Sequence, residues 1–295
     1  MVRIAVEYIV PLSLEGRKLG TLLHHDLGLS SSQIKSAKWD GRILVNGQTT
    51  FVSYCVHAGD HILLTEAQTV PKYAVSAMQL ELNMYYEDNC LLILDKPSGL
   101  ATSSSMNHPD DALENAVFSY LGCPDNYIFR PVNRLDKGTS GLMCVAKDAL
   151  TQHALQKMLH TDDFVRTYLA VTDGIPSKSE GIIDLPIAKA EGPTIRREIR
   201  EDGKPSVTHY QIIRTHGNRA LVQLQLKTGR THQIRVHLSA IGCPVFGDFL
   251  YGTESEELPG RFALHSEHVL LRHPQTHELL DYHCPLPDSL KHLLD

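Results

Sequence analysis

The sequence has few aromatic residues and no long hydrophobic run. Aromatic residues make up 6% of the 295 positions, and there is a single tryptophan. No stretch of about 18 consecutive apolar residues occurs, which argues against a transmembrane helix. The chain enters the alternating segment from Val2 to Tyr8 at once, unlike a signal peptide. With 42% hydrophobic and 21% charged residues, it is predicted to be globular and long enough for two domains.

Motifs for metals, nucleotide cofactors and disulfide frameworks are missing as well. None of the cysteines forms a Cys-x-x-Cys pair, and none joins the close histidine pairs at zinc-site spacing. His-Glu-x-x-His, phosphate loops and dinucleotide fingerprints are also absent. We therefore expect reduced core cysteines in a cytoplasmic protein that needs no cofactor and no metal. The six cysteines are Cys55, Cys90, Cys123, Cys144, Cys243 and Cys284.

The chain has no overall excess of positive charge, but its cations are unevenly distributed. The net charge of −6 argues weakly against a nucleic-acid partner. Two segments nevertheless carry cations almost without acids, and phosphate recognition depends on such local stripes. The alternative is that both segments are solvated faces balanced by neighbours. The cations are Arg130, Arg134, Lys137 and Lys147 in the first segment, against Asp136 alone, and Lys227, Arg230 and Arg235 in the second.

A lone carboxylate lies within the first of these segments, in residues 133–142 (NRLDKGTSGL). Asp136 stands between two cations in a turn rich in Gly, Thr and Ser, and nearby cations favour the ionised carboxylate. Such a group can act as a nucleophile or a base. An ordinary surface turn with a charge pair remains open on this local pattern, because structural ion pairs also perturb carboxylates. The second segment, residues 228–235 (TGRTHQIR), places an arginine where a loop enters a helix.

Both segments resemble motifs of the RluA-type pseudouridine synthases. The first is similar to that family's His-Arg-Leu-Asp followed by Thr-Ser-Gly-Leu, and the second to its Gly-Arg-Thr-His-Gln-Ile-Arg block. The resemblance extends from about Leu91 to Leu294 and departs at Asn133, where the family usually has His. Further blocks in the same order are residues 94–100, 168–170, 247–252 and 263–265.

The resemblance implies a reaction and the residues that perform it. Pseudouridine formation breaks the N1–C1′ bond of a uridine, turns the base and rejoins it through C5, without oxidation. Asp136 would be the essential carboxylate, and Arg230 would be the arginine that pairs with it. Tyr168 would stack on the uracil and serve the C5 proton step, although a core aromatic is the alternative.

Other residues of the two motifs would hold the RNA. Arg134 would fill the space left by the flipped uridine, since a planar guanidinium stacks on bases. Contacts to phosphates or loops are expected from Lys137, Thr139, Ser140 and Arg235. Each of these side chains has a structural alternative, such as Thr139 capping its own turn.

The first 70 residues are predicted to form a separate module. Leucines at helical spacing end at Gly28, Ser30 and Ser31 are N-cap candidates for a second helix, and Asn46-Gly47 predicts a tight hairpin. This order resembles the alpha-L RNA-binding module appended to many of these synthases. A small packing domain is the alternative. The cations that would face a phosphate backbone are Arg17, Lys18, Lys35, Lys38 and Arg42.

Residues 71–81 read as a linker, and residues 82–295 as the catalytic domain. Strands and helices interleave there without a regular βαβ rhythm, which favours an α+β fold with a long mixed or antiparallel central sheet. Strands are expected from Gly141 to Ala146 and from Phe164 to Val171, and a helix from Arg230 to Ala240. The small N-terminal module is also predicted to be α+β.

The sequence therefore predicts an RNA pseudouridine synthase that acts as a monomer on structured RNA. Ribosomal RNA is favoured and transfer RNA is possible. A glycoside or nucleoside hydrolase would want a second carboxylate across the scissile bond, and neither motif carries one. The remaining rival is a catalytically silent RNA-binding or ribosome-assembly factor, to which only the departure at Asn133 points.

Overall fold

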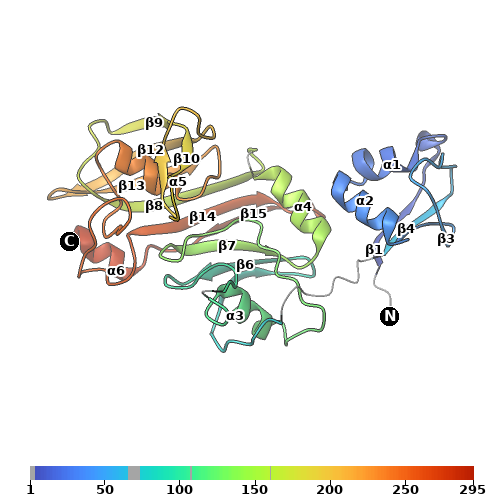
Figure 1. Cartoon of the computed structure of the whole chain (residues 1–295), viewed down its shortest axis with the longest axis horizontal. Coiled ribbons are helices and arrows are strands. Elements are labelled where there is room, and N and C mark those ends of the chain that lie inside the picture. The colour runs from blue at the N-terminus through green and yellow to red at the C-terminus, as the bar shows by residue number, and fades with distance from the viewer. Residues whose placement is uncertain (1–3, 66–73, 107, 160) are drawn as a thin grey trace.

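The computed structural model describes residues 4–65, 74–106, 108–159 and 161–295. Residues 4–65 contain a four-stranded sheet in the order β1-β4-β2-β3 and a hydrophobic cluster of their own (Figure 1). The predicted boundary at residue 70 and part of the linker 71–81 lie outside the described residues, so the domain limits stay predictions. The elements are β1 (Ile4–Ile9), α1 (Leu19–Thr21), a π-helical turn (Leu22–Asp26), α2 (Ser31–Trp39), β2 (Ile43–Val45), β3 (Gln48–Thr49) and β4 (His61–Thr65).

Local signals in this first part are confirmed. Ser30 is the N-cap of α2: its Oγ accepts from the N–H of Gln33 at 3.2 Å, and its own N–H donates to the Gln33 side chain at 2.8 Å. Asn46 and Gly47 both have positive φ angles and join β2 to β3, as a two-residue hairpin turn requires. The cap therefore fixes the start of α2, and the Asn46 side chain also ties the hairpin turn to Asp60 and His61.

The remainder of the chain is built on one nine-stranded sheet, which confirms the predicted α+β class. Its order is β5-β6-β7-β14-β8-β13-β12-β9, with β15 beside β14. Among these strands β7 and β14 pair in parallel and the other pairs are antiparallel. The strands are β5 (Asn83–Glu87), β6 (Leu91–Lys96), β7 (Ser140–Ala146), β8 (Phe164–Asp173), β9 (Glu180–Asp184), β12 (Val207–His216), β13 (Arg219–Leu226), β14 (Leu264–Arg272) and β15 (Leu279–His283).

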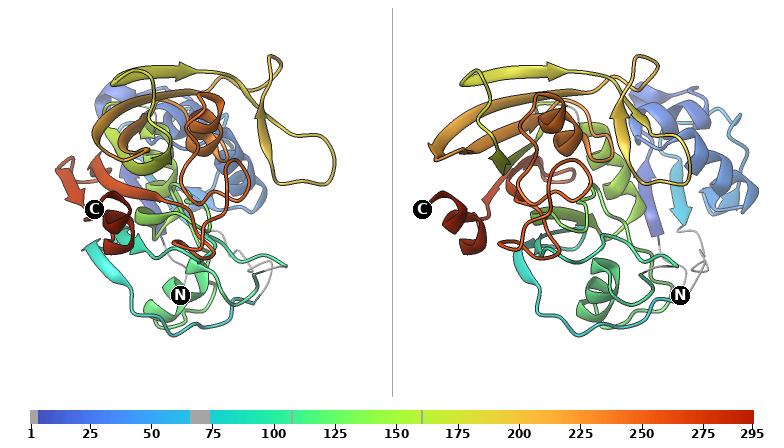
Figure 2. Two further views of the ribbon diagram at one scale, coloured as in Figure 1. Left: turned by 90° about the vertical axis from the view of Figure 1, so that its left-hand side faces the viewer. Right: turned by 60° about the vertical axis from the view of Figure 1, so that its left-hand side comes forward.

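Helices and a separate hairpin pack around this sheet, which curves strongly in Figure 2. One hydrophobic cluster holds side chains of the sheet together with α3 and the C-terminal turns, and a second lies between the sheet and α4. Asp148 caps α4 by accepting from the N–H groups of Leu150 and Thr151. The helices are α3 (Leu113–Tyr120), α4 (Ala149–Met158), α5 (Gln233–Ala240) and α6 (Asp288–Lys291), and the hairpin is β10 (Ile187–Lys189) with β11 (Arg197–Ile199).

Four of the six cysteines are buried, as predicted for core residues. The prediction is wrong for Cys55 and Cys123, which are exposed. Cys123 follows α3 in a left-handed turn with φ of 53°, so no sheet or helix covers it. All six are free thiols. Of the helices in the described residues, none has the length and apolar character needed to cross a membrane.

The parallel contact between β7 and β14 depends on a glycine. Gly141 lies opposite Ser266, with φ of 108°. A Cβ atom on Gly141 would come within 2.8 Å of three backbone atoms of Ser266. The Gly of the Thr-Ser-Gly-Leu block therefore lets β14 approach the strand that follows the Asp136 turn.

Gly141→Ala is expected to cost more than about 3 kcal/mol of the free energy of unfolding, because backbone clash adds to conformational strain. Gly122→Ala is the matched control, since Gly122 also has positive φ (78°) but nothing within 4 Å of the added methyl. That control should cost only about 1–2 kcal/mol. Denaturant unfolding of both variants measures the difference, and equal losses would deny the close approach of β14.

Candidate active site

Asp136 lies in an irregular turn before β7, between exposed and buried neighbours. The side chain of Asp136 is 28% exposed, Arg134 and Lys137 are exposed, and Leu135 is buried. Thr102 Oγ1 holds the turn: it donates to the carbonyl of Leu135 at 2.7 Å and accepts from its N–H at 3.3 Å. The carboxylate is thus presented to solvent from a backbone that is anchored in the core.

A buried lysine ties a second loop to this turn. The side chain of Lys96, at the end of β6, is fully buried, and its Nζ donates to the carbonyls of Pro97 at 2.8 Å and Leu100 at 2.9 Å. The same Nζ lies 3.5 Å from the carbonyl of Lys137, which also accepts from the N–H of Gly99 at 2.7 Å. Burial lowers the pKa of Lys96 to about 7. The charges of Asp136 and Asp95 act against that shift.

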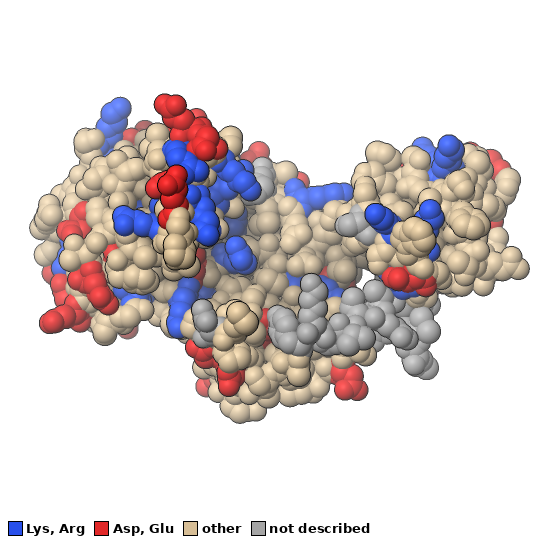
Figure 3. Space-filling view, in the orientation of Figure 1, with Lys and Arg blue, Asp and Glu red and all other residues tan. Residues whose placement is uncertain are grey.

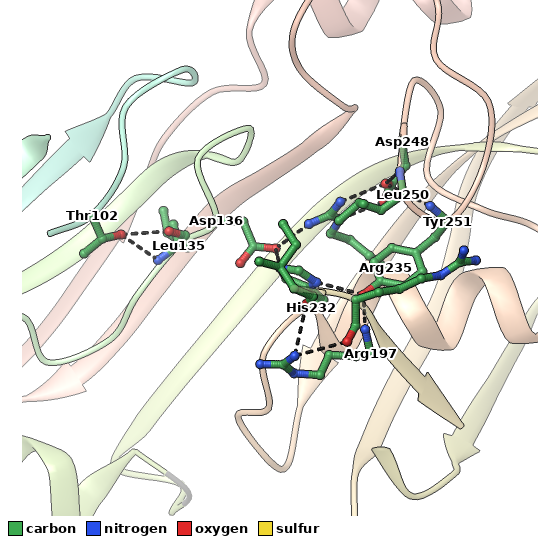
Figure 4. Close-up of polar contacts among 11 residues, drawn as sticks. Thr102, Leu135, Asp136, Arg197, His232, Arg235, Asp248, Leu250 and Tyr251 are labelled. Carbon is green, nitrogen blue, oxygen red and sulfur yellow. Dashed lines mark hydrogen bonds and ion pairs between the residues drawn. The ribbon is translucent and has the colours of Figure 1, made fainter. Parts of the chain in front are cut away.

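Arg235 links Asp136 to a second, fully buried aspartate (Figure 4). Its Nη1 donates to Asp136 Oδ2 at 3.1 Å, while Nε and Nη2 bind both oxygens of Asp248 at 2.7 and 2.8 Å. Burial opposes the charge of Arg235, but the hydrogen bonds and charges of the two carboxylates outweigh it and raise the pKa of the guanidinium. The bidentate pair with Asp248 fixes the guanidinium plane, which then faces Asp136.

The predicted ion pair between Arg230 and Asp136 is wrong. The expected helix from 230 to 240 begins only at Gln233, because His232 has φ of 57° and breaks the helical path. Arg230 therefore stays in the preceding loop, where its exposed side chain donates from Nε to the carbonyl of Pro205 at 3.2 Å. The arginine that contacts Asp136 is the second one of the same motif, Arg235.

Aromatic rings surround the guanidinium of Arg235. Its central carbon lies 4.1 Å from the ring centroid of Phe262 and 5.1 Å from that of Tyr251. Gly138 makes room for the first ring, since a Cβ there would lie 2.6 Å from a Phe262 carbon. These rings keep water from the cation, which strengthens its attraction to both carboxylates.

His232 is the other neighbour of the carboxylate. Its Nδ1 lies 2.8 Å from the hydroxyl of Tyr251, whose oxygen accepts from the N–H of Arg197 at 2.8 Å. Its Nε2 lies 3.9 Å from Asp136 Oδ2. Burial lowers the pKa of His232, and the charge of Asp136 only partly offsets this. The lowered pKa favours the neutral ring near pH 7.

The other predicted site residues are distributed differently. Tyr168, on β8, is 4% exposed and packs in the larger cluster; within the described residues it has no hydrogen bond to Asp136. Arg134 and Lys137 are exposed, as a contact with RNA requires. Thr139 is buried, and its N–H closes the turn onto the carbonyl of Asp136 at 3.0 Å, which is a contact within its own loop. Arg235 is 2% exposed, and for both residues the expected contact with RNA stays a prediction.

Asn133 has a structural position in place of the family's histidine. Its Oδ1 accepts from the N–H of Cys144 at 3.0 Å, and the residue is buried. Its Nδ2 has no partner among the described residues. Asn133 therefore fastens the start of the turn to β7, beside the helix-facing side of the sheet, and takes no part in the ion pairs of Asp136.

Two clusters outside this site have ligand atoms close enough for a metal ion. They are Asp88, Cys90 and His273, and His268, Asp281 and His283.

Neither cluster presents converging lone pairs. In the first, His273 Nδ1 accepts from the N–H of Thr276 at 3.0 Å, so Nε2 carries its proton toward Asp88. In the second, the rings of His268 and His283 are stacked 4.1 Å apart and 5° from parallel. Because ring lone pairs lie in the ring plane, two parallel stacked imidazoles cannot point at one ion. The expected absence of a metal stays a prediction.

In the N-terminal module the predicted phosphate-binding cations differ in availability. Arg17 is held by both oxygens of Asp26 at 2.7 and 2.8 Å, so the expectation that it faces phosphate is not supported. Arg42 is bonded to Asp40. Lys35 is exposed, and no carboxylate of the described residues lies within 4.0 Å of it.

Sequence reasoning missed Lys96, Asp248 and Phe262 as parts of the site. Asp248 follows the apolar run Val245–Phe246 in a block that was noticed but given no role. An acidic residue in such a run is buried only with a cationic partner, and that rule would have pointed to it. Lys96 ends a buried strand in the same way.

Comparison with known proteins places this site in a family. Residues 90–240 match the RNA pseudouridylate synthase family. The chain is 34% identical to the uncharacterized RNA pseudouridine synthase YjbO of Bacillus subtilis, over 91% of this chain and 95% of the relative. It is 33% identical to ribosomal large subunit pseudouridine synthase D of Pseudomonas aeruginosa, over 97% of this chain and 93% of the relative.

A solved structure agrees. Human RNA pseudouridylate synthase domain containing 1 superimposes with a TM-score of 0.59 at 27% identity, over 75% of this chain and 89% of that protein. These relatives are named as synthases, which supports an enzyme and not the silent RNA-binding alternative. The chain belongs to the RNA pseudouridylate synthase family and is an isomerase that acts on RNA.

Proposed function

We propose that Asp136 is the essential carboxylate of this isomerase and that Arg235 is the residue that positions it. The observation that carries the proposal is the linked set Asp136–Arg235–Asp248, in which one guanidinium bonds a half-exposed and a buried carboxylate. Asp248 fixes the guanidinium, and the guanidinium fixes the rotamer of Asp136. The negative charge of Asp136 is therefore held at the surface of the turn, where a base can approach.

The chemical steps require three functions near one uridine. Asp136 acts on the sugar or the base when the N1–C1′ bond breaks, and the oxygen that does not face Arg235 is the one free to do so. Tyr168 stacks on the detached uracil and serves the removal of the C5 proton. The ring of His232, whose Nε2 lies 3.9 Å from the carboxylate and whose pKa is lowered by burial, borders the anion without adding a second positive charge.

The target uridine must leave its stack before it reaches Asp136. Arg134, exposed two residues before the carboxylate, fills the vacated position, and Lys137 contacts a phosphate. Figure 3 shows Lys and Arg side chains gathered over β10 and α5 and along the hollowed centre of this face. Arg230 is also exposed, and its role is to bind RNA and not to pair with Asp136.

The substrate is structured RNA, with large-subunit ribosomal RNA as the favoured target. Support comes from relatives named for the large ribosomal subunit, which match almost the whole chain. The proposed division is an RNA-binding module in residues 1–70 and a catalytic domain in residues 82–295. The enzyme works in the cytoplasm as a monomer, without a metal or cofactor.

Mapping of carbodiimide-reactive uridines in total RNA tests this function. A strain that lacks the gene is compared with the parent and with a strain complemented by the Asp136→Asn variant. Loss of one or a few reactive uridines of large-subunit RNA in the deletion strain, restored only by the unmodified gene, is the expected result. Loss of a signal from transfer RNA alone would identify transfer RNA as the substrate. If no signal is lost in the deletion strain, the proposal is contradicted.

Removal of residues 1–70 is expected to weaken RNA affinity by about tenfold or more while kcat on bound RNA changes little. The reason is that the removed part has its own hydrophobic cluster, whereas Asp136, Arg235 and Asp248 lie in the remainder. Filter binding and single-turnover kinetics separate the two quantities. Unchanged affinity would make the module a packing domain.

A further inference from the structure

The single tryptophan of the chain lies on the surface of the N-terminal module. Trp39 is the last residue of α2, and 76% of it is exposed. It borders a shallow hollow of about 570 Å³ between α2 and the turn that follows α1. The hollow is lined by Gly20, Thr21, His24, His25, Ser31, Ile34, Lys35, Lys38, Trp39 and Val52. A large exposed aromatic side chain beside a hollow that also holds polar and charged groups suits a partner with a flat apolar face.

The two lysines of this hollow are available, unlike Arg17 and Arg42 of the same module. Lys38 Nζ lies 5.7 Å from the ring centroid of Trp39. Within the described residues, no carboxylate lies within 4.0 Å of Lys35 or Lys38. Arg17 and Arg42, in contrast, are held by Asp26 and Asp40. The hollow thus combines one exposed aromatic ring with two unpaired ammonium groups.

The helix that carries Trp39 is held at both of its ends. The capping box of Ser30 and Gln33 fixes the start of α2. At its end Asp40 accepts from Ser36 Oγ at 3.0 Å and from Arg42 Nε at 3.1 Å, which fixes the residue next to Trp39. These bonds also occupy the nearest carboxylate, so its charge is balanced. A platform held in this way loses little conformational freedom when a ligand binds.

His24 adds a polar group at the opposite wall. Its Nδ1 lies 2.7 Å from the carbonyl of Leu29, so Nδ1 carries the proton and donates. Its Nε2 is left as an acceptor toward the hollow, beside the ring of His25 at 4.8 Å. An aromatic platform, flanking ammonium groups and one acceptor suit a nucleobase with its adjacent phosphates. A protein partner could pack an apolar side chain on the ring, but it would not require the two unpaired ammonium groups beside it.

We infer that an unpaired nucleobase of the RNA stacks on Trp39, with its neighbouring phosphates on Lys35 and Lys38. This inference rests on the proposed RNA-binding role of the module and names the structural class it recognises: a single-stranded loop or bulge. Bases within a duplex cannot reach the ring, because their faces are covered by their neighbours. The module therefore selects RNA that carries an unpaired base.

The single tryptophan makes the site directly observable. Stacking of a base on Trp39 quenches its fluorescence, and the full-length protein carries no other tryptophan to obscure the signal. The probes are a single-stranded oligouridylate of about 12 nucleotides and a blunt RNA duplex of the same length. Saturable quenching by the single strand, and little by the duplex, is the expected result. Binding of the single strand without quenching would overturn the inference.

Variants test the contribution of the ring. Trp39→Leu should weaken binding of the single strand by about tenfold, and Trp39→Phe by much less, since it keeps a ring for stacking. Phe51→Leu is the matched control, because Phe51 is 73% exposed in the same module but does not line the hollow. Equal affinity of Trp39→Leu and the unmodified protein, measured by filter binding, would also overturn the inference.

The outcome is independent of the catalytic assignment. Trp39→Leu leaves the Asp136 turn untouched, so kcat at saturating RNA should stay within about twofold while the apparent KM rises. If the protein forms no pseudouridine in any RNA yet shows the tryptophan quenching, the proposed function fails and this site stands. If pseudouridine forms normally and quenching is absent, the proposed function stands and the stacking site on Trp39 fails.

Discussion

Asp136→Asn is expected to reduce pseudouridine formation by at least about ten-thousand-fold, because no other carboxylate can replace it. In the unmodified protein Arg235 Nη1 donates to Asp136 Oδ2 at 3.1 Å. Asn keeps the size of the side chain, and its amide oxygen can still accept this hydrogen bond. What it lacks is the negative charge and the nucleophilic or basic oxygen. The measurement is release of tritium from C5 of labelled uridine in RNA, under single-turnover conditions.

The control separates charge at the site from charge elsewhere. Asp162→Asn removes a carboxylate whose side chain is fully exposed and only 3.9 Å from the mobile ammonium of Lys227. It should leave the rate within about twofold, in line with the small worth of exposed ion pairs. The thermal unfolding of Asp136→Asn should also match the unmodified protein, since the turn is held by Thr102 and Lys96. Turnover that survives the substitution would remove Asp136 from the mechanism.

Residues whose role depends on local signals were predictable from the sequence. The Ser30 cap, the Asn46-Gly47 turn and the buried strands β7 and β8 are each encoded within a few neighbouring residues. For Asp136 the contiguous turn and flanking cations indicated only a candidate carboxylate, and its essential role is what the family resemblance implies. The pairing of Arg17 was not predictable: its partner Asp26 comes from the next turn of the module, and sequence spacing alone does not pair them.

Arg230 was named as the partner of Asp136 because of the family resemblance, and helical spacing could not have corrected that choice. If the helix started at Arg230, the apolar positions 234, 238 and 241 would place Arg230 on the inward face at 100° per residue, and Arg235 about 100° away. The left-handed backbone of His232 ends that extrapolation, since α5 begins only at Gln233. Six consecutive residues of α5 are then buried, so periodicity carries no information about which of them faces Asp136.

Asp248 illustrates a second limit. A buried carboxylate requires a cationic partner, and this much follows from its apolar surroundings. The identity of the partner does not, because Arg235 lies 13 residues earlier and on the other side of a turn. The need for a cationic partner follows from the local sequence, but the partner itself is supplied by a tertiary contact. The same is true of Lys96, whose acceptors include the carbonyl of Lys137 41 residues away.

Arg235→Lys is expected to lower the rate by about a hundredfold or more, whereas Arg230→Ala lowers it by less than about tenfold. Lysine keeps the positive charge between the two carboxylates but cannot bind Asp248 through two parallel bonds and Asp136 through a third. The rotamer of Asp136 then loses its support. Arg230→Ala removes only an exposed side chain with one bond to a carbonyl, so it should raise KM for RNA more than it lowers kcat.

Lysine is the informative substitution because alanine confounds two effects. Arg235→Ala leaves Asp248 buried without a cation, which costs about 3–5 kcal/mol and can unfold the domain. Arg235→Ala combined with Asp248→Asn relieves that charge, and this double variant should fold as stably as Arg235→Lys while remaining inactive. Single-turnover rates and denaturant unfolding are measured for the unmodified protein, Arg230→Ala, Arg235→Lys, Arg235→Ala and the double variant. Together they separate stability from catalysis. A larger kcat loss in Arg230→Ala than in Arg235→Lys would show that the RNA-bound enzyme pairs Asp136 with Arg230, contrary to the geometry of the free chain.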